Sequence, residues 1–271
     1  MMKTYRDYIS AYRRIFEEGK STAPSMEVTA PAVVAGDGPV ILIFSPHPDD
    51  ECASGGMALR LQREVGARVV NIPVTFGSNS ERRAARCEEL KASCKHLSFE
   101  LPEPVDLDGL ETPEKIAEML RVYRPQMIFF PHAEDWNGTH ERVHRLVMDA
   151  LPLADVPCLL VQTEVWRAMK NPNLMVELSE DILTAQIESM SLHVGEVARN
   201  PYHLSLPIRV MDNVRRGCEV VLGQGGETPD CMFALLYHIS KWADGAQQDV
   251  LSEGRYFSVQ DGLGELLKET F

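Results

Sequence analysis

One short stretch of the sequence, Phe44-Ser45-Pro46-His47-Pro48-Asp49-Asp50-Glu51, gathers one imidazole and three carboxylates. His47 and Asp50 could bind one zinc ion, because imidazole nitrogen and carboxylate oxygen are its usual ligands besides thiolate. Asp49 would then lie beside the metal as a general base that takes a proton from an activated water. The alternative is an acidic helix start that only caps free N–H groups. That alternative explains one carboxylate better than three beside a histidine, so the stretch predicts a catalytic metal site.

A second cluster contains His140 and His144, which are four residues apart and share one face of a predicted helix. With Glu141 they form the pattern His-Glu-Arg-Val-His, which matches the HExxH pattern of zinc proteases. In that interpretation Glu141 is the base and a downstream carboxylate such as Glu164 is the third ligand. It ranks second, because it leaves the first cluster unexplained.

Three further residues are candidates for substrate binding. Arg86, with Arg82 and Arg83, lies at the start of a predicted helix just after a strand and could hold a polar or phosphorylated substrate, although a solvated helix face is the simpler interpretation. Trp136 and Asn137 could form a wall against a sugar ring, and a partly buried loop tryptophan is the alternative. Asp135, in the same loop, is a candidate of another kind. It could orient a ligand histidine, and the alternative is that it is an ordinary polar loop residue.

Two predicted strands bring the clusters together. The apolar run Val40-Ile41-Leu42-Ile43 precedes the first cluster, and residues 126–131 precede the loop that leads to the second. Ligands of open α/β sheets bind at the carboxyl ends of strands, where the following helices begin. The pattern predicts an α/β fold with a Rossmann-like, mostly parallel sheet, helices on both faces and both clusters at one edge.

The remaining elements follow from periodicity and from capping residues. Apolar residues at helical spacing predict helices over 2–20, from Met57 to Val65, from a Ser80 cap to Leu97, from Pro113 to about Arg124, and from a Ser179 cap to about His193. Strands are expected over 68–76, where Pro73 favours an edge position or a bulge, and over 158–166. Nearer the carboxyl terminus we expect a strand over 218–222 and a helix over 229–242.

These elements suggest a helical arm and linker over 1–37, packed onto a single domain over 38–271. Within the domain, residues 38–150 form the Rossmann-like core. Residues 151–271 form a C-terminal α/β part that shapes the substrate entrance.

Composition narrows the class of partner. The net charge of -13 argues against nucleic acid or an anionic membrane surface, because either would require a basic face. The six cysteines form no Cys-x-x-Cys pair and the chain has no long apolar segment, so we expect a reducing, cytoplasmic setting. The expected partner is a small neutral or cationic molecule, although the net charge leaves room for a local basic pocket, and a homo-oligomer is left open.

Residues 45–51 resemble the HPDDE signature of the PIG-L/LmbE family of zinc-dependent de-N-acetylases. The segment from Arg86 to Ser98 is similar to the Arg-x-x-Glu-Leu helix of that family, and the resemblance covers about residues 38–150. It implies an LmbE-like fold and hydrolysis of an N-acetyl group on N-acetylglucosamine, another amino sugar or a sugar conjugate. It also implies Zn²⁺ as the cofactor, and Fe²⁺ would accept the same ligands.

The resemblance implies roles for individual residues. His47, Asp50 and His144 would hold zinc, Asp49 would be the base, and His140 would be a catalytic acid or an oxyanion stabiliser. The family has His-x-x-His on this helix, whereas the spacing here is His140-x-x-x-His144. The division of roles between the two histidines therefore stays open at this point.

Two other classes of function remain as alternatives. One is a zinc peptidase that uses His140, Glu141 and His144. The other is a non-catalytic sugar-binding protein that retains the metal cluster.

Overall fold

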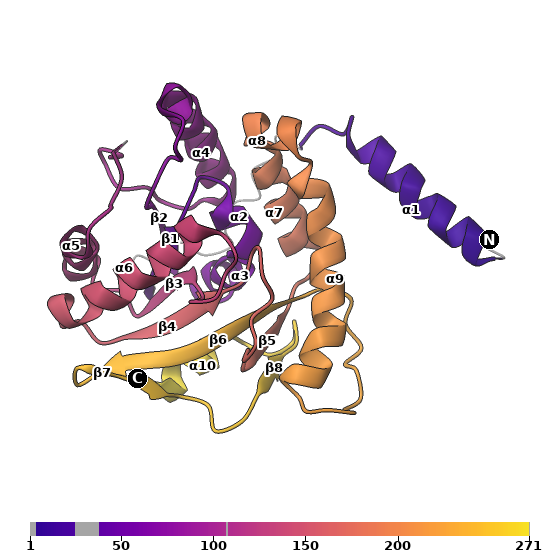
Figure 1. Ribbon diagram of the computed structural model, residues 1–271. Coiled ribbons are helices and arrows are strands. Elements are labelled where there is room, and N and C mark those ends of the chain that lie inside the picture. The colour runs from indigo at the N-terminus through magenta and orange to yellow at the C-terminus, as the bar shows by residue number, and fades with distance from the viewer. Residues whose placement is uncertain (1–3, 25–37, 107, 271) are drawn as a thin grey trace.

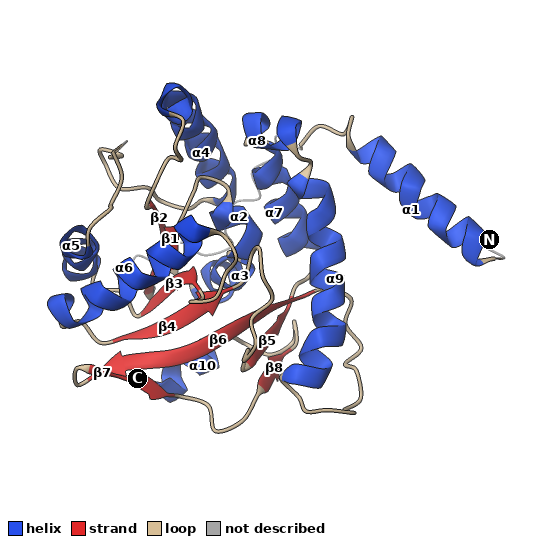
Figure 2. Ribbon diagram, in the orientation of Figure 1, coloured by secondary structure: helices blue, strands red, loops and turns tan. Residues whose placement is uncertain are grey.

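One sheet runs through the protein, with helices on both of its faces (Figure 1, Figure 2). The computed structural model describes residues 4–24, 38–106 and 108–270. The strands are β1 (Val40–Ser45), β2 (Arg68–Pro73), β3 (Met127–Pro131), β4 (Cys158–Thr163), β5 (Leu174–Glu177), β6 (Ala234–Ala243), β7 (Ala246–Asp249) and β8 (Arg255–Phe257).

The strands follow the order β2-β1-β3-β4-β6-β5-β8, and β7 pairs with β6 outside this path. The first four are parallel, β6 is antiparallel to β4, β5 and β7, and β5 is parallel to β8. The predicted Rossmann-like arrangement is confirmed for the parallel part. β2 lies at the sheet edge, as Pro73 suggested.

The helices lie on both faces of the sheet (Figure 2). They are α1 (Tyr5–Gly19), α2 (Asp50–Ser54), α3 (Gly56–Val65), the 3₁₀ turn η1 (Ser80–Arg82), α4 (Arg83–Leu97), α5 (Pro113–Tyr123), α6 (Gly138–Ala154), α7 (Glu180–Ser191), α8 (Val194–Arg199), α9 (Tyr202–Val220) and α10 (Gly264–Thr270). None of the described helices is long and apolar enough to cross a membrane.

Alternate residues of β1 define the two layers. Leu42 and Phe44 pack with α5 and α6 on one face. Ile41 and Ile43 face the larger core formed by helices that include α3, α4, α7 and α9. Both faces of the strand are buried, which explains why its sequence is a continuous apolar run without alternation.

The N-terminal helix is present, but it is not packed onto the domain as expected. α1 has a Thr4 capping box and no buried residue, and it extends away from the domain in Figure 1. Its contacts with the domain include the approach of the Tyr12 hydroxyl to Met211 Sδ, at 3.9 Å. The expected linker lies largely in 25–37, outside the described residues, and the division into arm and domain stays a prediction.

Two C-terminal predictions are wrong. Residues 218–222 do not form a strand, because the helix α9 runs to Val220 and its C-cap is Val221. Val210, Val214 and Cys218 form the buried stripe of that helix. Most of 229–242 belongs to strand β6, not to a helix. Short apolar runs cannot be assigned from periodicity alone, and β6 is covered on both faces.

One helix cap is also different. Asn79, not Ser80, provides the cap, since its side chain accepts a hydrogen bond from Glu81 N at 3.0 Å. A 3₁₀ turn follows before α4 begins at Arg83. The caps Thr112 and Ser179 are confirmed.

Candidate active site

The loops that follow β1 and β3 meet at one edge of the sheet, where these parallel strands end together. His47 and Asp50 follow β1, and His140 lies in the first turn of α6. One ligand atom of each residue lies within 4.8 Å of the others. The Oδ2 atom of Asp50 is 3.5 Å from His47 Nδ1 and 3.3 Å from His140 Nε2. The expected convergence of the two clusters is therefore present.

The donor atoms of this group fit a divalent metal ion. His140 is fully buried, and neither of its ring nitrogens has a hydrogen-bond partner among the described residues. Burial alone would lower the pKa of His140, but the neighbouring carboxylates of Asp50 and Asp135 raise it to about 10. The group thus favours positive charge. Two imidazoles and one carboxylate match three-ligand catalytic zinc sites, and iron(II) accepts the same donors.

Asp135 is placed to orient a ligand. Its Oδ2 lies 3.3 Å from His140 Nδ1, on the side of the ring that faces away from Asp50. The same oxygen accepts hydrogen bonds from the backbone N–H groups of Val165 and Trp166. A carboxylate behind a ligand histidine fixes the tautomer and the ring orientation.

Asp49 differs from its two acidic neighbours. It is the N-cap residue of α2, yet its side chain accepts no capping hydrogen bond and lines a cavity. Its φ of 117° lies in a region that residues other than glycine rarely adopt, and such strain concentrates at functional sites. Burial and the charges of Asp50 and Glu51 raise the pKa of Asp49 well above its usual value, and Arg86 opposes them. Helix capping therefore does not explain Asp49.

Glu51 supports the loop from behind. Its carboxylate accepts hydrogen bonds from Asp49 N at 2.9 Å, from Ser93 Oγ at 2.6 Å and from His193 Nε2 at 2.8 Å. Cys52 lies in the same buried group, and burial raises the pKa of its thiol well above its usual value. Three hydrogen bonds already engage the Glu51 carboxylate, so this group forms a hydrogen-bond network that holds the loop.

The structure separates the two histidines of α6. His144 Nδ1 lies 2.9 Å from Pro131 O, and the ring packs against Phe130. His140, in the first turn of the helix, lies between Asp50 and Asp135. His144 is one turn further along and lies against Phe130 and Pro131, at the end of β3. Within the part of the chain that the structure describes, no three-residue ligand group includes His144. The expected placement of His144 beside His47 and Asp50 is thus not what the structure shows.

The zinc-peptidase interpretation lacks its third ligand. Glu164 forms a bidentate ion pair with Arg216, with nitrogen–oxygen distances of 2.7 and 3.0 Å, and also accepts a hydrogen bond from Met169 N. Its carboxylate is engaged, and no ligand group of the described residues contains it. His140 and His144 also point to different surroundings.

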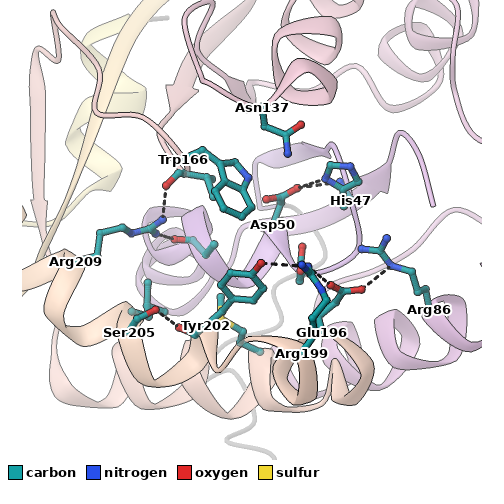
Figure 3. A pocket seen from close by; sticks show the side chains of 15 residues that line it. His47, Asp50, Arg86, Asn137, Trp166, Glu196, Arg199, Tyr202, Ser205 and Arg209 are labelled. Atoms are coloured by element: carbon teal, nitrogen blue, oxygen red, sulfur yellow. Dashed lines mark hydrogen bonds and ion pairs between the residues drawn. The ribbon is translucent and has the colours of Figure 1, made fainter. Parts of the chain in front are cut away.

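His47, Asp50 and His140 form the candidate ligand group. A cavity of about 300 Å³ opens onto two of them, His47 and Asp50 (Figure 3). Its lining consists of His47, Asp49, Asp50, Ala53, Arg86, Asn137, Val165, Trp166, Met190, Glu196, Arg199, Tyr202, Ser205, Leu206 and Arg209. Two of the three predicted substrate residues, Arg86 and Asn137, are among them. The third, Trp136, is 74% exposed, and its ring lies 6.0 Å from that of Trp166 at the cavity wall.

Asn137 has two functions in this geometry. Its Oδ1 caps α6 by accepting a hydrogen bond from Thr139 N at 2.9 Å. Its side chain points into the cavity, beside the metal-ligand group (Figure 3). Because the oxygen is used by the cap, the amide N–H₂ group is available as a donor to a ligand.

The opposite wall comes from the C-terminal half of the chain. Trp166 follows β4, Glu196 lies on α8, and Tyr202 begins α9. The rings of Trp166 and Tyr202 meet edge to face at 5.9 Å. Glu196 binds Arg199 at 2.7 Å and lies 3.9 Å from Arg86 Nε, and these cations lower its pKa although burial raises it.

Sequence reasoning missed this wall, whose polar and aromatic members are Trp166, Glu196, Arg199, Tyr202 and Arg209. They carry no motif, and α8 and α9 were not predicted. The aromatic residues near 166 and 202 are a weak signal, since tryptophan and tyrosine often line sugar sites.

Comparisons with known proteins place part of the chain in a family. Residues 42–151 match the profile of the family described as PIG-L: GlcNAc-PI de-N-acetylase. The resemblance inferred from the sequence is confirmed for this segment. No curated protein matches the chain.

Solved structures share the fold at low sequence identity. The N,N'-diacetylchitobiose deacetylase of Pyrococcus horikoshii is 14% identical, with a TM-score of 0.56 and coverage of 88% of this chain and 94% of that chain. The conserved protein TT1542 of Thermus thermophilus is 18% identical, with a TM-score of 0.56 and coverage of 73% and 93%. The 4-carboxy-2-hydroxymuconate hydratase GalB of Pseudomonas putida is 16% identical, with a TM-score of 0.55 and coverage of 74% and 95%. Proteins with this fold therefore catalyse more than one reaction. The reaction of this chain has to be argued from the residues of its site.

Proposed function

We propose that this chain, whose residues 42–151 match the PIG-L family profile, removes an N-acetyl group from an amino sugar or a sugar conjugate. The observation that carries the proposal is the group of His47, Asp50 and His140 on a cavity that Asp49 also lines. The similarity of the fold to a diacetylchitobiose deacetylase supports the same class of reaction.

His47, Asp50 and His140 would hold the metal ion, with Asp135 orienting His140. A divalent ion bound there supplies Lewis-acid activation of the water and of the amide carbonyl. We assign His140 to the metal in place of His144, because only His140 lies with the other two ligands.

Asp49 would move the proton. As water adds to the carbonyl carbon, Asp49 accepts a proton from it, and the C–N bond breaks when Asp49 passes that proton to the departing nitrogen. The products are acetate and the free amine. A raised pKa suits a carboxyl group that must both accept and release a proton near neutral pH.

Asn137 would stabilise the oxyanion that forms in the transition state. Its amide N–H₂ group faces the cavity, while its oxygen is held by the start of α6. We assign the oxyanion role to Asn137 and not to His140 as expected from the sequence. Both ring nitrogens of His140 face carboxylates and are not free to donate to an oxyanion.

Acetate release from a panel of N-acetyl sugars tests the proposal. The metal-loaded wild-type protein should release acetate from at least one of them, and Asp49→Asn should lower kcat by about 10²- to 10⁴-fold with unchanged metal content. Near wild-type turnover by Asp49→Asn would remove the base assignment. Binding of acetylated sugars without any acetate release would support the non-catalytic alternative.

A further inference from the structure

Arg209 is a cation in the cavity whose positive charge no described carboxylate neutralises at short range. It lies on α9, on the side of the cavity away from Arg86 (Figure 3). Two backbone carbonyl groups hold its guanidinium: Nη1 donates to Val165 O at 3.4 Å and Nη2 donates to Ala53 O. Its Nε is buried and has no hydrogen-bond partner among the described residues.

The other arginines near this site are paired differently. Arg82, Arg86 and Arg199 share Glu196, at 2.9, 3.9 and 2.7 Å. Arg216, two turns along the helix from Arg209, holds Glu164. Arg209 has no carboxylate within 4.0 Å in the described part of the chain. Carbonyl dipoles orient its guanidinium group but do not neutralise its charge.

The carboxylates that act on Arg209 from a greater distance have other partners. They are Glu164, Asp50 and Asp135. Arg216 holds the first, the two histidines of the ligand group surround the second, and the third faces His140 and two backbone N–H groups. None of them is free to move onto Arg209.

Arg209 is half-buried, and a cation partly removed from water without a close counter-charge is unfavourable, so desolvation lowers the pKa of Arg209. Guanidinium nevertheless stays charged in proteins, and it has five N–H donors in a planar fork. Only two of these donors are used by the carbonyl groups. A ligand anion that enters the cavity would supply the missing negative charge. It would also accept hydrogen bonds from guanidinium N–H groups that the two carbonyl groups leave free.

We propose that Arg209 binds a carboxylate group of the substrate, so that the preferred substrate is an N-acetylated amino sugar or conjugate that carries a carboxylate. This inference rests on the proposed function. An arginine that has no carboxylate within 4.0 Å among the described residues matches one monoanionic group, and carboxylate geometry fits its fork. Phosphate, which is dianionic, is usually held by several cations or by a helix amino terminus, and Arg209 lies within α9.

Three probes test the proposal: N-acetylglucosamine, N-acetylmuramic acid, which adds a carboxylate, and N-acetylglucosamine 6-phosphate. Calorimetric titration of the metal-loaded protein should show about tenfold or tighter binding of the carboxylate probe than of the neutral one. Equal binding of these two probes, or binding of neither, would overturn the proposal. Tighter binding of the phosphate probe than of the carboxylate probe would overturn the choice of carboxylate.

Variants assign the preference to Arg209. Arg209→Gln should abolish it while affinity for the neutral probe and metal content stay unchanged, and Arg209→Lys should keep a reduced preference. Arg215→Gln is the matched control, because Arg215 lies on the same helix, is exposed and pairs with Asp212. A preference that survives in Arg209→Gln would contradict the assignment. If this variant does not fold, the comparison of Arg209→Lys with wild type decides.

The outcomes also separate this inference from the proposed function. Acetate release from all probes alike would support the deacetylase and remove the role of Arg209. Carboxylate-dependent binding that is lost in Arg209→Gln, without acetate release from any probe, would support the anion site and contradict the deacetylase.

Discussion

The two halves of the chain contribute different parts of one cavity. The loops after β1 and β3, in the N-terminal half, bring the ligand group and Asp49, and each of these residues lies within ten positions of a buried strand. The C-terminal half brings Trp166, Tyr202 and Arg209 from the end of β4 and from α9. The family profile ends at residue 151. The comparison suggests that the matched half determines the reaction and that the other half selects the substrate.

The largest expected effect is loss of the metal. Asp50→Ala should weaken metal binding by at least about a hundredfold, because it removes the carboxylate that lies between the two imidazoles. Elemental analysis after dialysis measures it. His144→Gln is the control and should keep its metal, since His144 is bound to Pro131 O. Loss of metal from His144→Gln, with retention in Asp50→Ala, would reverse our assignment of ligands.

A loss of turnover with the metal retained is expected at Asn137. Asn137→Asp keeps an oxygen to cap α6 but removes the amide donors, so kcat should fall by about 10²- to 10³-fold with little change in melting temperature. Steady-state kinetics and a thermal melt measure the two quantities. A variant with unchanged kcat would show that the oxyanion is stabilised elsewhere.

The C-terminal wall should affect binding more than chemistry. Trp166→Ala should raise KM by about tenfold, with kcat and metal content retained, because the ring lines the cavity wall but supplies no ligand atom. Trp136→Ala is the comparison, and its effect should be smaller because Trp136 is 74% exposed and does not line the cavity. A fall in kcat without a change in KM would argue against the division between the halves.

The smallest effect should come from the competing motif. Glu141→Gln should leave metal content and acetate release within about twofold of wild type, because Glu141 is not part of the ligand group. A large loss of activity in this variant, accompanied by cleavage of peptides by the wild type, would restore the peptidase hypothesis.

The site could be predicted from the sequence where chemistry lies next to a strong local signal. His47, Asp49 and Asp50 follow a buried strand directly, so the sheet topology alone brought them to the correct edge. The two histidines of α6 show the limit of this reasoning. Spacing along a helix indicates that two side chains share a face, but not which of them lies beside Asp50.

The C-terminal half could not be predicted in the same way. β6 is buried on both faces, so it has no alternation, and its residues include the good helix formers Ala234, Leu235 and Leu236. Arg209 shows the other difficulty. Nothing in its local sequence indicates that it will lie in a cavity without a carboxylate, since that depends on contacts with Ala53 and Val165.

Tyr237 has a consequence for how the molecule unfolds. This β6 residue is fully buried, and its hydroxyl donates to Ser54 O at 2.9 Å and accepts from Met57 N at 3.2 Å, where α2 meets α3. A fragment cut after residue 151 would lose this anchor and also β4, the neighbour of β3 in the sheet. We therefore expect that the half that contains His47, Asp50 and His140 is not an independent folding unit. Heating should unfold both halves in a single transition. Metal added to the N-terminal ligand group should therefore also raise the temperature at which the C-terminal half unfolds.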